Sequence, residues 1–293
     1  MMKKLRLLLT GLLSALVLFS CQTPKSGSKS SAEEQLSEFG KEVNKVYPDL
    51  GSPGEIAMLI EMTGADYVPD LVADTANTEK YLGDEDMAAL NLGLFTADLA
   101  YTTSFQQRDQ SLATLKSCQT LANDLGVGVT YLASLMKYYD KEVEHKDSIL
   151  MFLEQKTGTI KEDLSEKSKQ RLYTAFVTGF VVENLHLATG IIQTYPDDLL
   201  PDDAKALVLR EMILIVLESE RNVNELITMV DEVLTDQDPR ILYDELVDLK
   251  ASFDKVNFEE IAHIENPAEI LSNEGLLEIT DKVAKLRATI VGV

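Results

Sequence analysis

The chain has 293 residues, with 49 acidic and 27 basic side chains and a formal net charge of −22 at pH 7. An acidic protein is repelled by nucleic acid phosphates and by anionic lipid surfaces, so the composition excludes both as charge-driven partners. Only three histidines are available for acid–base catalysis. The sequence also has no glycine-rich phosphate loop, no His-Glu-x-x-His, no nucleophile elbow and no paired-cysteine motif. No catalytic residue is therefore predicted, and a non-enzymatic role is preferred.

Residues 1–20 have the layout of a bacterial export signal. A basic start, Lys3 to Arg6, leads into the apolar run from Leu5 to Phe19, which is shorter than the ~20 residues of a membrane-spanning helix. The run ends in Leu18-Phe19-Ser20-Cys21, which resembles the lipobox of bacterial lipoproteins. The resemblance implies that the signal is removed and that Cys21 becomes the first mature residue, carrying acyl chains such as palmitate. An uncleaved anchor helix and an ordinary secretory signal are the alternatives.

A flexible polar tether is predicted directly after the lipidated cysteine, over residues 21–31. Its residues after Cys21 read QTPKSGSKSS, with no apolar side chain to bury. Gln22, rather than aspartate, follows the cysteine, which in the usual sorting pattern of lipoproteins indicates the outer membrane. No acidic cluster resembling a surface-export signal follows, so we expect the body to face the periplasm rather than the cell exterior.

The body, residues 32–293, has no break rich in proline, glycine or serine, so we expect one domain. Removal of the signal takes away three basic and no acidic residues, and the mature chain therefore carries −25 rather than −22. Helix-start signals recur at Ser52-Pro53, Asp238-Pro239 and Asn266-Pro267, whereas strand-like alternation is missing. The sequence predicts a single antiparallel all-α bundle with helices near 32–46, 53–63, 84–107, 109–124, 127–144, 148–156, 166–194, 202–218, 221–235, 239–256 and 275–290.

Two of these helices are apolar on nearly all sides, and we expect them at the centre of the bundle. The helix at 166–194 has Glu183 as its only charged side chain from Leu172 onward. The helix at 202–218 carries Arg210 and Glu211 between apolar runs, so at least one of these charges must meet protein rather than water.

Two glycines also interrupt the helix at 166–194. Gly179 and Gly190 each cost about 1 kcal/mol relative to alanine inside a helix. We therefore expect a neighbouring backbone to approach closely at both positions.

Four polar residues intrude into the predicted core and form the candidate site: Asp98, Glu183, His186 and Glu211. Glu183 and His186 are three residues apart and so share a helix face. Glu-x-x-His, with carboxylates from other helices, is the ligand pattern of di-iron bundles, so a metal ion at Glu183 and His186 is one hypothesis. The preferred hypothesis is a buried network in which these two residues hydrogen-bond to Arg210 or a tyrosine, with no cofactor. Convergence of the four would make either such a network or a small polar pocket.

A wider resemblance covers about residues 82–233. The stretch GLFTADLAY at 93–101, the KDSIL segment at 146–150 and the segment 179–192 around Glu183 resemble a family of helical lipoproteins from Bacteroidetes-type bacteria. Where that family has Gly-Gly-Trp-Ile-Glu, this chain has GFVVE at 179–183, and it contains no tryptophan. The resemblance implies a helical lipoprotein and adds no chemistry.

Together these features predict a lipid-anchored helical protein on the periplasmic face of the outer membrane, with a protein-binding or structural role. Its expected partners are the membrane, through Cys21, and another envelope protein. The alternative is a bundle that binds a metal ion or a small ligand around Glu183 and His186. A third hypothesis, carboxylate-driven hydrolysis, requires Asp98, Glu183 and Glu211 to line a cleft that is open to solvent.

Overall fold

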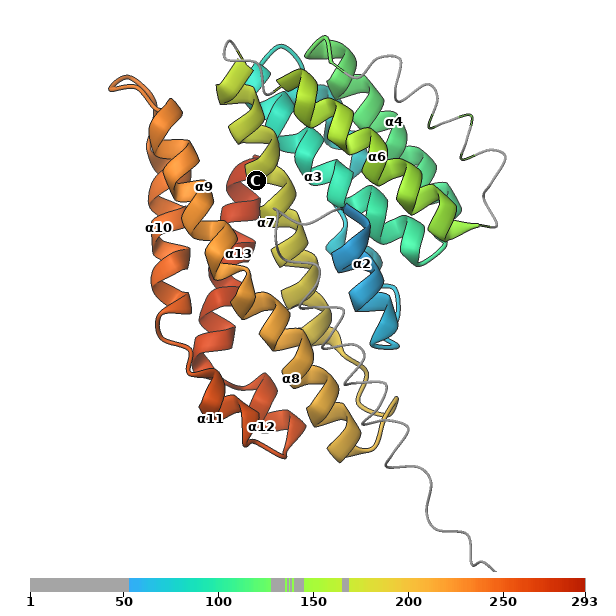
Figure 1. The fold of residues 1–293 in the computed structure, drawn as a ribbon, viewed down its shortest axis with the longest axis vertical. Coiled ribbons are helices and arrows are strands. Elements are labelled where there is room, and N and C mark those ends of the chain that lie inside the picture. The colour runs from blue at the N-terminus through green and yellow to red at the C-terminus, as the bar shows by residue number, and fades with distance from the viewer. Residues whose placement is uncertain are drawn as a thin grey trace, which may run out of the picture.

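A computed structural model describes residues 53–127, residues 135, 137 and 139, and residues 145–164 and 169–292. Within these residues the regular elements are helices and no strand occurs, so the predicted all-α bundle is confirmed (Figure 1). The signal, the tether at 21–31, the predicted helix at 32–46 and nearly all of the one at 127–144 lie outside the described residues.

The described helices follow the predicted order, and most begin and end within a few residues of the expected positions. They are α2 (Pro53–Met62), α3 (Glu85–Ser104), α4 (Arg108–Asp124), α6 (Lys146–Leu164), α7 (Gln170–Thr194), α8 (Asp202–Glu218), α9 (Glu220–Val233), α10 (Ile241–Phe253), α11 (Phe258–Ala262), α12 (Pro267–Leu271) and α13 (Glu274–Val291). The short helix α11 and two 3₁₀ helices, Pro69–Leu71 and Thr75–Tyr81, were not among the predicted elements, and of α12 only the start at Asn266-Pro267 was predicted.

The largest difference from the predicted boundaries is in α6, which continues through Gly158 to Leu164 instead of ending at 156. Leu153, Ile160 and Leu164 are all buried, and their spacing of seven and four places them on one face of the helix. Burial of this face outweighs the helix-weakening effect of the glycine.

Side-chain capping explains one predicted helix start and corrects another. Asn266 accepts a hydrogen bond from the amide of Ala268 at 3.0 Å, with Pro267 in the first turn of α12, as the sequence predicts. The predicted cap at Asp238 is wrong. α10 begins later, and the Asp238 carboxylate accepts hydrogen bonds from the amide and hydroxyl of Thr235 instead.

The centre of the bundle is the crossing of α3 and α7, where two glycines let the backbones touch. A Cβ at Gly179 would fall well inside 3.0 Å of the Leu90 carbonyl oxygen, and a Cβ at Gly93 equally close to a carbonyl oxygen of α7. Because a backbone carbonyl cannot swing aside as a side chain can, only glycine fits at either position. The predicted backbone approach at Gly179 is confirmed.

At Gly190 the predicted backbone approach is wrong. The nearest atoms to a Cβ there belong to the side chain of Leu71, which lies in the 3₁₀ helix that precedes α3. Gly190 therefore makes room for the side chain of Leu71 against α7. The close approach of α3 and α7 depends on Gly93 and Gly179.

α7 runs through the middle of the molecule, with α2, α3, α4 and α6 on one side and α8 to α13 on the other (Figure 1). Its most extensive packing is with α3. α8, the other helix that we expected at the centre, packs on α7 and α12 and buries Leu209, Ile213 and Val216. By length and apolar composition alone α7 could cross a membrane, but most of it is buried inside the bundle, as expected for a core helix.

Candidate functional site

The predicted polar residues Asp98 and Glu183 meet in the core beside Arg287, which comes from α13. Glu183 Oε2 accepts a hydrogen bond from Arg287 Nε at 2.7 Å, and Oε1 accepts one from Nη2 at 2.9 Å, which makes a bidentate ion pair. Arg287 Nη2 also donates to the Leu71 carbonyl oxygen at 3.1 Å. Asp98 and Glu183 are fully buried, and the Arg287 side chain is 15% exposed. These residues form the buried polar cluster, which ties α3, α7 and α13 together.

Asp98 has a raised pKa in the buried polar cluster. Its Oδ2 accepts a hydrogen bond from the Ala73 amide at 3.0 Å. Burial raises the pKa of Asp98 well above its usual range, the charge of Glu183 and a hydrogen bond with that carboxylate raise it further, and Arg287 opposes them. The raised pKa favours the protonated form of Asp98 beside the ion pair of Glu183 and Arg287. In that form the cluster holds one carboxylate and one guanidinium, with no net charge.

His186 and Glu211, the other two predicted site residues, lie differently. His186 is near the buried polar cluster, and burial lowers the pKa of its imidazole although Glu183 opposes this, so it is neutral at pH 7. Glu211 lies apart on α8, next to Arg210. Arg210 donates to a backbone carbonyl oxygen after α11 at 2.5 Å. The expected pairing of Arg210 with Glu183 or His186 is therefore wrong, and Arg287 takes that place.

The geometry of this cluster favours a structural network. Both oxygens of Glu183 are bound by Arg287, whose positive charge repels a metal cation. Within the described parts of the chain, no three His, Cys, Asp or Glu side chains are placed to hold a metal ion together. Metal binding by Glu183 and His186 stays a prediction. Asp98 and Glu183 are sealed from water, so they do not line the open cleft that hydrolysis would require.

The raised pKa of Asp98 predicts a pH effect on stability. Because its pKa is raised on folding, the stabilisation is complete below about pH 4, the ordinary Asp value, and is lost as the pH rises toward the folded pKa. Asp98→Asn supplies a permanent amide donor, so its free energy of unfolding relative to wild type should rise with pH. Urea unfolding between about pH 5 and pH 9 measures this difference.

The matched control for that prediction is Asp147→Asn, because Asp147 is exposed in the first turn of α6. The difference in free energy of unfolding between Asp147→Asn and wild type should stay constant over the same pH range. A difference that is equally constant for Asp98→Asn would show that Asp98 is ionised in the folded protein.

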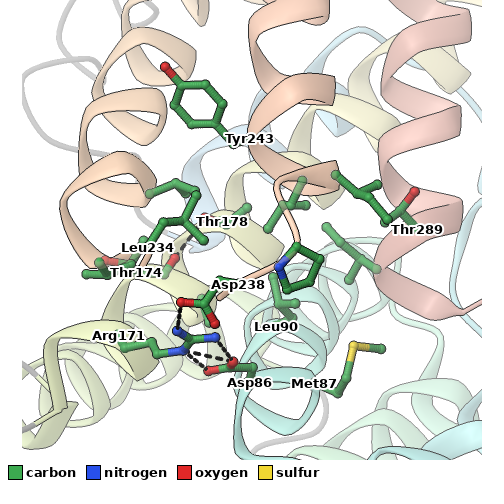
Figure 2. Close-up of a pocket in the computed structure, with 17 residues that line it drawn as sticks. Asp86, Met87, Leu90, Arg171, Thr174, Thr178, Leu234, Asp238, Tyr243 and Thr289 are labelled. Atoms are coloured by element: carbon green, nitrogen blue, oxygen red, sulfur yellow. Dashed lines mark hydrogen bonds and ion pairs between the residues drawn. The ribbon is translucent and has the colours of Figure 1, made fainter. Parts of the chain in front are cut away.

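A second candidate site is an apolar groove at one end of the bundle, between α3, α7, α9, α10 and α13 (Figure 2). It encloses about 240 Å³. Its walls are mostly aliphatic and include Leu90, Ala175, Val230, Leu234, Leu242 and Ile290. Ile241, the first residue of α10, also lines the groove, and its residue surface is 59% exposed.

Charged side chains form one rim of the apolar groove (Figure 2). Arg171 Nε lies 2.9 Å from both carboxylate oxygens of Asp86, and Arg171 Nη1 donates to Asp238 Oδ2 at 2.9 Å. The hydrogen bond from Arg171, together with those from Thr235, holds the pKa of Asp238 well below its usual range. Two carboxylates thus surround one guanidinium, and the rim has a formal charge of −1.

Thr174 adds an unsatisfied hydroxyl to the groove lining. The residue is 2% exposed, and its Oγ1 has no hydrogen-bond partner among the described residues. Thr178 and Thr189 on the same helix each donate to the carbonyl four residues earlier at 2.8 Å. A buried polar group without a partner costs about 1–3 kcal/mol, so a ligand that bonds to Thr174 would gain free energy there.

Arg287, Arg171 and Asp86 were not predicted from the sequence. Arg287 could have been found, because it lies four residues after Val283 and three before Ile290, both on the buried face of α13. Arg171 carries a weaker signal: it is a cation in the first turn of α7, where the helix dipole disfavours one. Asp86 is an ordinary acidic residue of a first turn and carries no signal.

Comparisons with known proteins find no match: no family model, no curated protein and no solved structure corresponds to this chain. The fold itself defines an all-α helical bundle. The resemblance to helical lipoproteins stays a prediction.

Proposed function

We propose that this chain is a lipid-anchored helical protein of the bacterial cell envelope, which binds another envelope protein on the periplasmic side of the outer membrane. The signal that ends at Cys21 and the polar residues 22–31 support the anchor and the tether. Ten extended residues span at most about 33–36 Å. The tether would therefore keep the body close to its membrane, within reach of partners held at the same surface.

The apolar groove is the observation that carries the binding role. Its aliphatic walls, the exposed Ile241 and the unpaired Thr174 hydroxyl together form a surface on which burial by a partner would be favourable. Small-molecule pockets usually enclose about 300–1,000 Å³. At about 240 Å³, the groove suits a few apolar side chains of a protein better than a whole small ligand.

Cross-linking in cells tests both parts of the proposal. Mild cross-linking of cells that express the full chain should recover one envelope protein reproducibly after affinity purification. Cys21→Ser, which cannot accept a lipid, should move from the detergent phase to the aqueous phase and lose that cross-link by about tenfold or more, because tethering raises the effective concentration of the partner.

Two results would count against the proposal separately. Recovery of the chain alone under every cross-linking condition would contradict the binding role. If mass spectrometry of the wild-type protein finds no acyl chain on Cys21, the lipid anchor is wrong, whatever the cross-linking shows.

A further inference from the structure

The charges at the rim of the apolar groove favour a cation over an anion, because two carboxylates face one guanidinium. Within the described residues, the side-chain hydrogen bonds of Arg171 go to Asp86 and Asp238, so an incoming carboxylate or phosphate would meet two carboxylates beside the one guanidinium. Within the described structure, the hydrogen bonds to Asp238 all end on Oδ2, which leaves Oδ1 open to a further donor. An incoming ammonium or guanidinium group would also offset the formal charge of −1 at the rim.

We propose that the apolar groove takes a protein segment with aliphatic side chains next to a lysine or an arginine. The proposal rests on the proposed function, in that the partner is a protein, and it adds the chemistry of the segment. The aliphatic side chains of the segment fill the space between the groove walls at Leu90 and Ile290. Its basic side chain reaches Asp86 and Asp238 at the rim. The charge of −25 on the mature chain draws a basic segment toward the same protein at longer range.

The buried hydroxyl of Thr174 gives this segment a fixed polar contact. A peptide segment brings its own backbone amides and carbonyls into the groove, and each must find a partner when it leaves water. The Thr174 hydroxyl can donate to a carbonyl or accept from an amide. The segment thus matches three features of the groove. Its aliphatic side chains cover the apolar walls, its backbone bonds to the Thr174 hydroxyl, and its basic side chain meets the negative rim.

A random peptide library, selected on the full lipidated protein in detergent micelles and counter-selected on its uncharged Ile241→Ser variant, tests the proposal. We expect the enriched peptides to combine Leu, Ile, Met or Phe with Lys or Arg and to be depleted of Asp and Glu. The tightest of them, labelled with a fluorophore, is then titrated against single-site variants.

Two substitutions at one exposed position separate apolar contact from charge. Ile241→Glu and Ile241→Lys remove the same aliphatic side chain and place opposite charges beside the rim. A basic segment should bind Ile241→Lys about tenfold more weakly than Ile241→Glu, and this difference in affinity should narrow in high salt.

Thr174→Val, which keeps the shape of the side chain but loses the hydroxyl, should weaken binding severalfold. Met151→Lys should bind like wild type, because Met151 is 72% exposed on α6 and does not line the groove.

The proposal is overturned if the selection enriches no peptide that prefers wild type, if the enriched peptides are acidic, or if the two Ile241 variants bind equally. Ile241→Glu adds an acidic residue to the first turn of α10, which favours the helix. It therefore provides the folded comparison with wild type if Ile241→Lys melts early. If the cellular cross-link survives in Ile241→Lys, the groove is not the binding surface while the proposed function stands.

Discussion

Replacing Glu183 with glutamine should lower the free energy of unfolding by about 3–5 kcal/mol, the range for breaking a buried ion pair by removing one partner. Glu183 accepts hydrogen bonds from Arg287 Nε and Nη2 in a part of the core where the guanidinium is largely shielded from water. Glutamine keeps the shape of the side chain and removes its negative charge. Arg287 would then lie in the core without the carboxylate that binds both of its donor nitrogens.

Asp98 is the group that can limit this loss. Its pKa is raised beside Glu183 in the wild type, and without the Glu183 charge it would release its proton more readily and face Arg287 as the counter-ion. The double variant Glu183→Gln/Asp98→Asn has no carboxylate in the cluster, so its loss should exceed the sum of the two single losses. Additive losses would show that Asp98 does not respond to the charge at position 183.

Urea unfolding at pH 7 measures these differences, and an exposed ion pair provides the control. Arg221 donates to Glu225 at 3.0 Å on the surface of α9, and Glu225→Gln should change stability by no more than about 1 kcal/mol. A loss for Glu183→Gln as small as that for Glu225→Gln would contradict the view that the buried pair holds α7 and α13 together.

The sequence predicts the helices well, because hydrophobic periodicity is a property of each segment alone. α7 was recognised as a core helix from the scarcity of charge after Leu172, and most of it is buried. Where a predicted helix end was wrong, the burial of side chains against other helices determined where the helix ends. α6 passes Gly158 because Ile160 and Leu164 are buried further along it.

The two sites depend on contacts between distant parts of the chain, and for this reason the sequence predicted them incompletely. Asp98 and Glu183 stood out as polar residues among apolar neighbours. Their cation, Arg287, lies on an amphipathic helix whose other charges face solvent, and no local pattern connects it to Glu183. The apolar groove has no segment of its own: its walls come from five helices, and its rim joins Asp86 and Asp238, more than 150 residues apart.

Replacing Gly179 with alanine should destabilise the protein by about 3 kcal/mol or more, at the upper end of the range for overpacked cores. The new Cβ would overlap the backbone carbonyl of Leu90, and a backbone carbonyl in a buried helix has no other rotamer. α3 and α7 would have to separate, which opens gaps around the buried rings of Phe176 and Phe180.

Gly158→Ala on α6 is the matched control, because it makes the same chemical change where, among the described residues, no atom beyond its own stretch of helix lies within 4 Å of the new Cβ. Alanine should stabilise that position by about 0.5–1 kcal/mol. In denaturant unfolding, the two variants should therefore change the free energy of unfolding in opposite directions. Destabilisation by both would mean that the effect at Gly179 is not steric.

The crossing at Gly179 should also set the charge state of the buried polar cluster. Glu183 lies four residues after Gly179 on α7, and Asp98 lies five residues after Gly93 on α3, so a separation of the helices at the glycines moves the two carboxyl groups apart as well. Asp98 would lose part of the repulsion by Glu183 that raises its pKa. In the wild-type background, the free energy of unfolding of Asp98→Asn relative to its parent protein should rise with pH. In the Gly179→Ala background this rise should be smaller. An unchanged rise would show that the helix crossing and the cluster are independent.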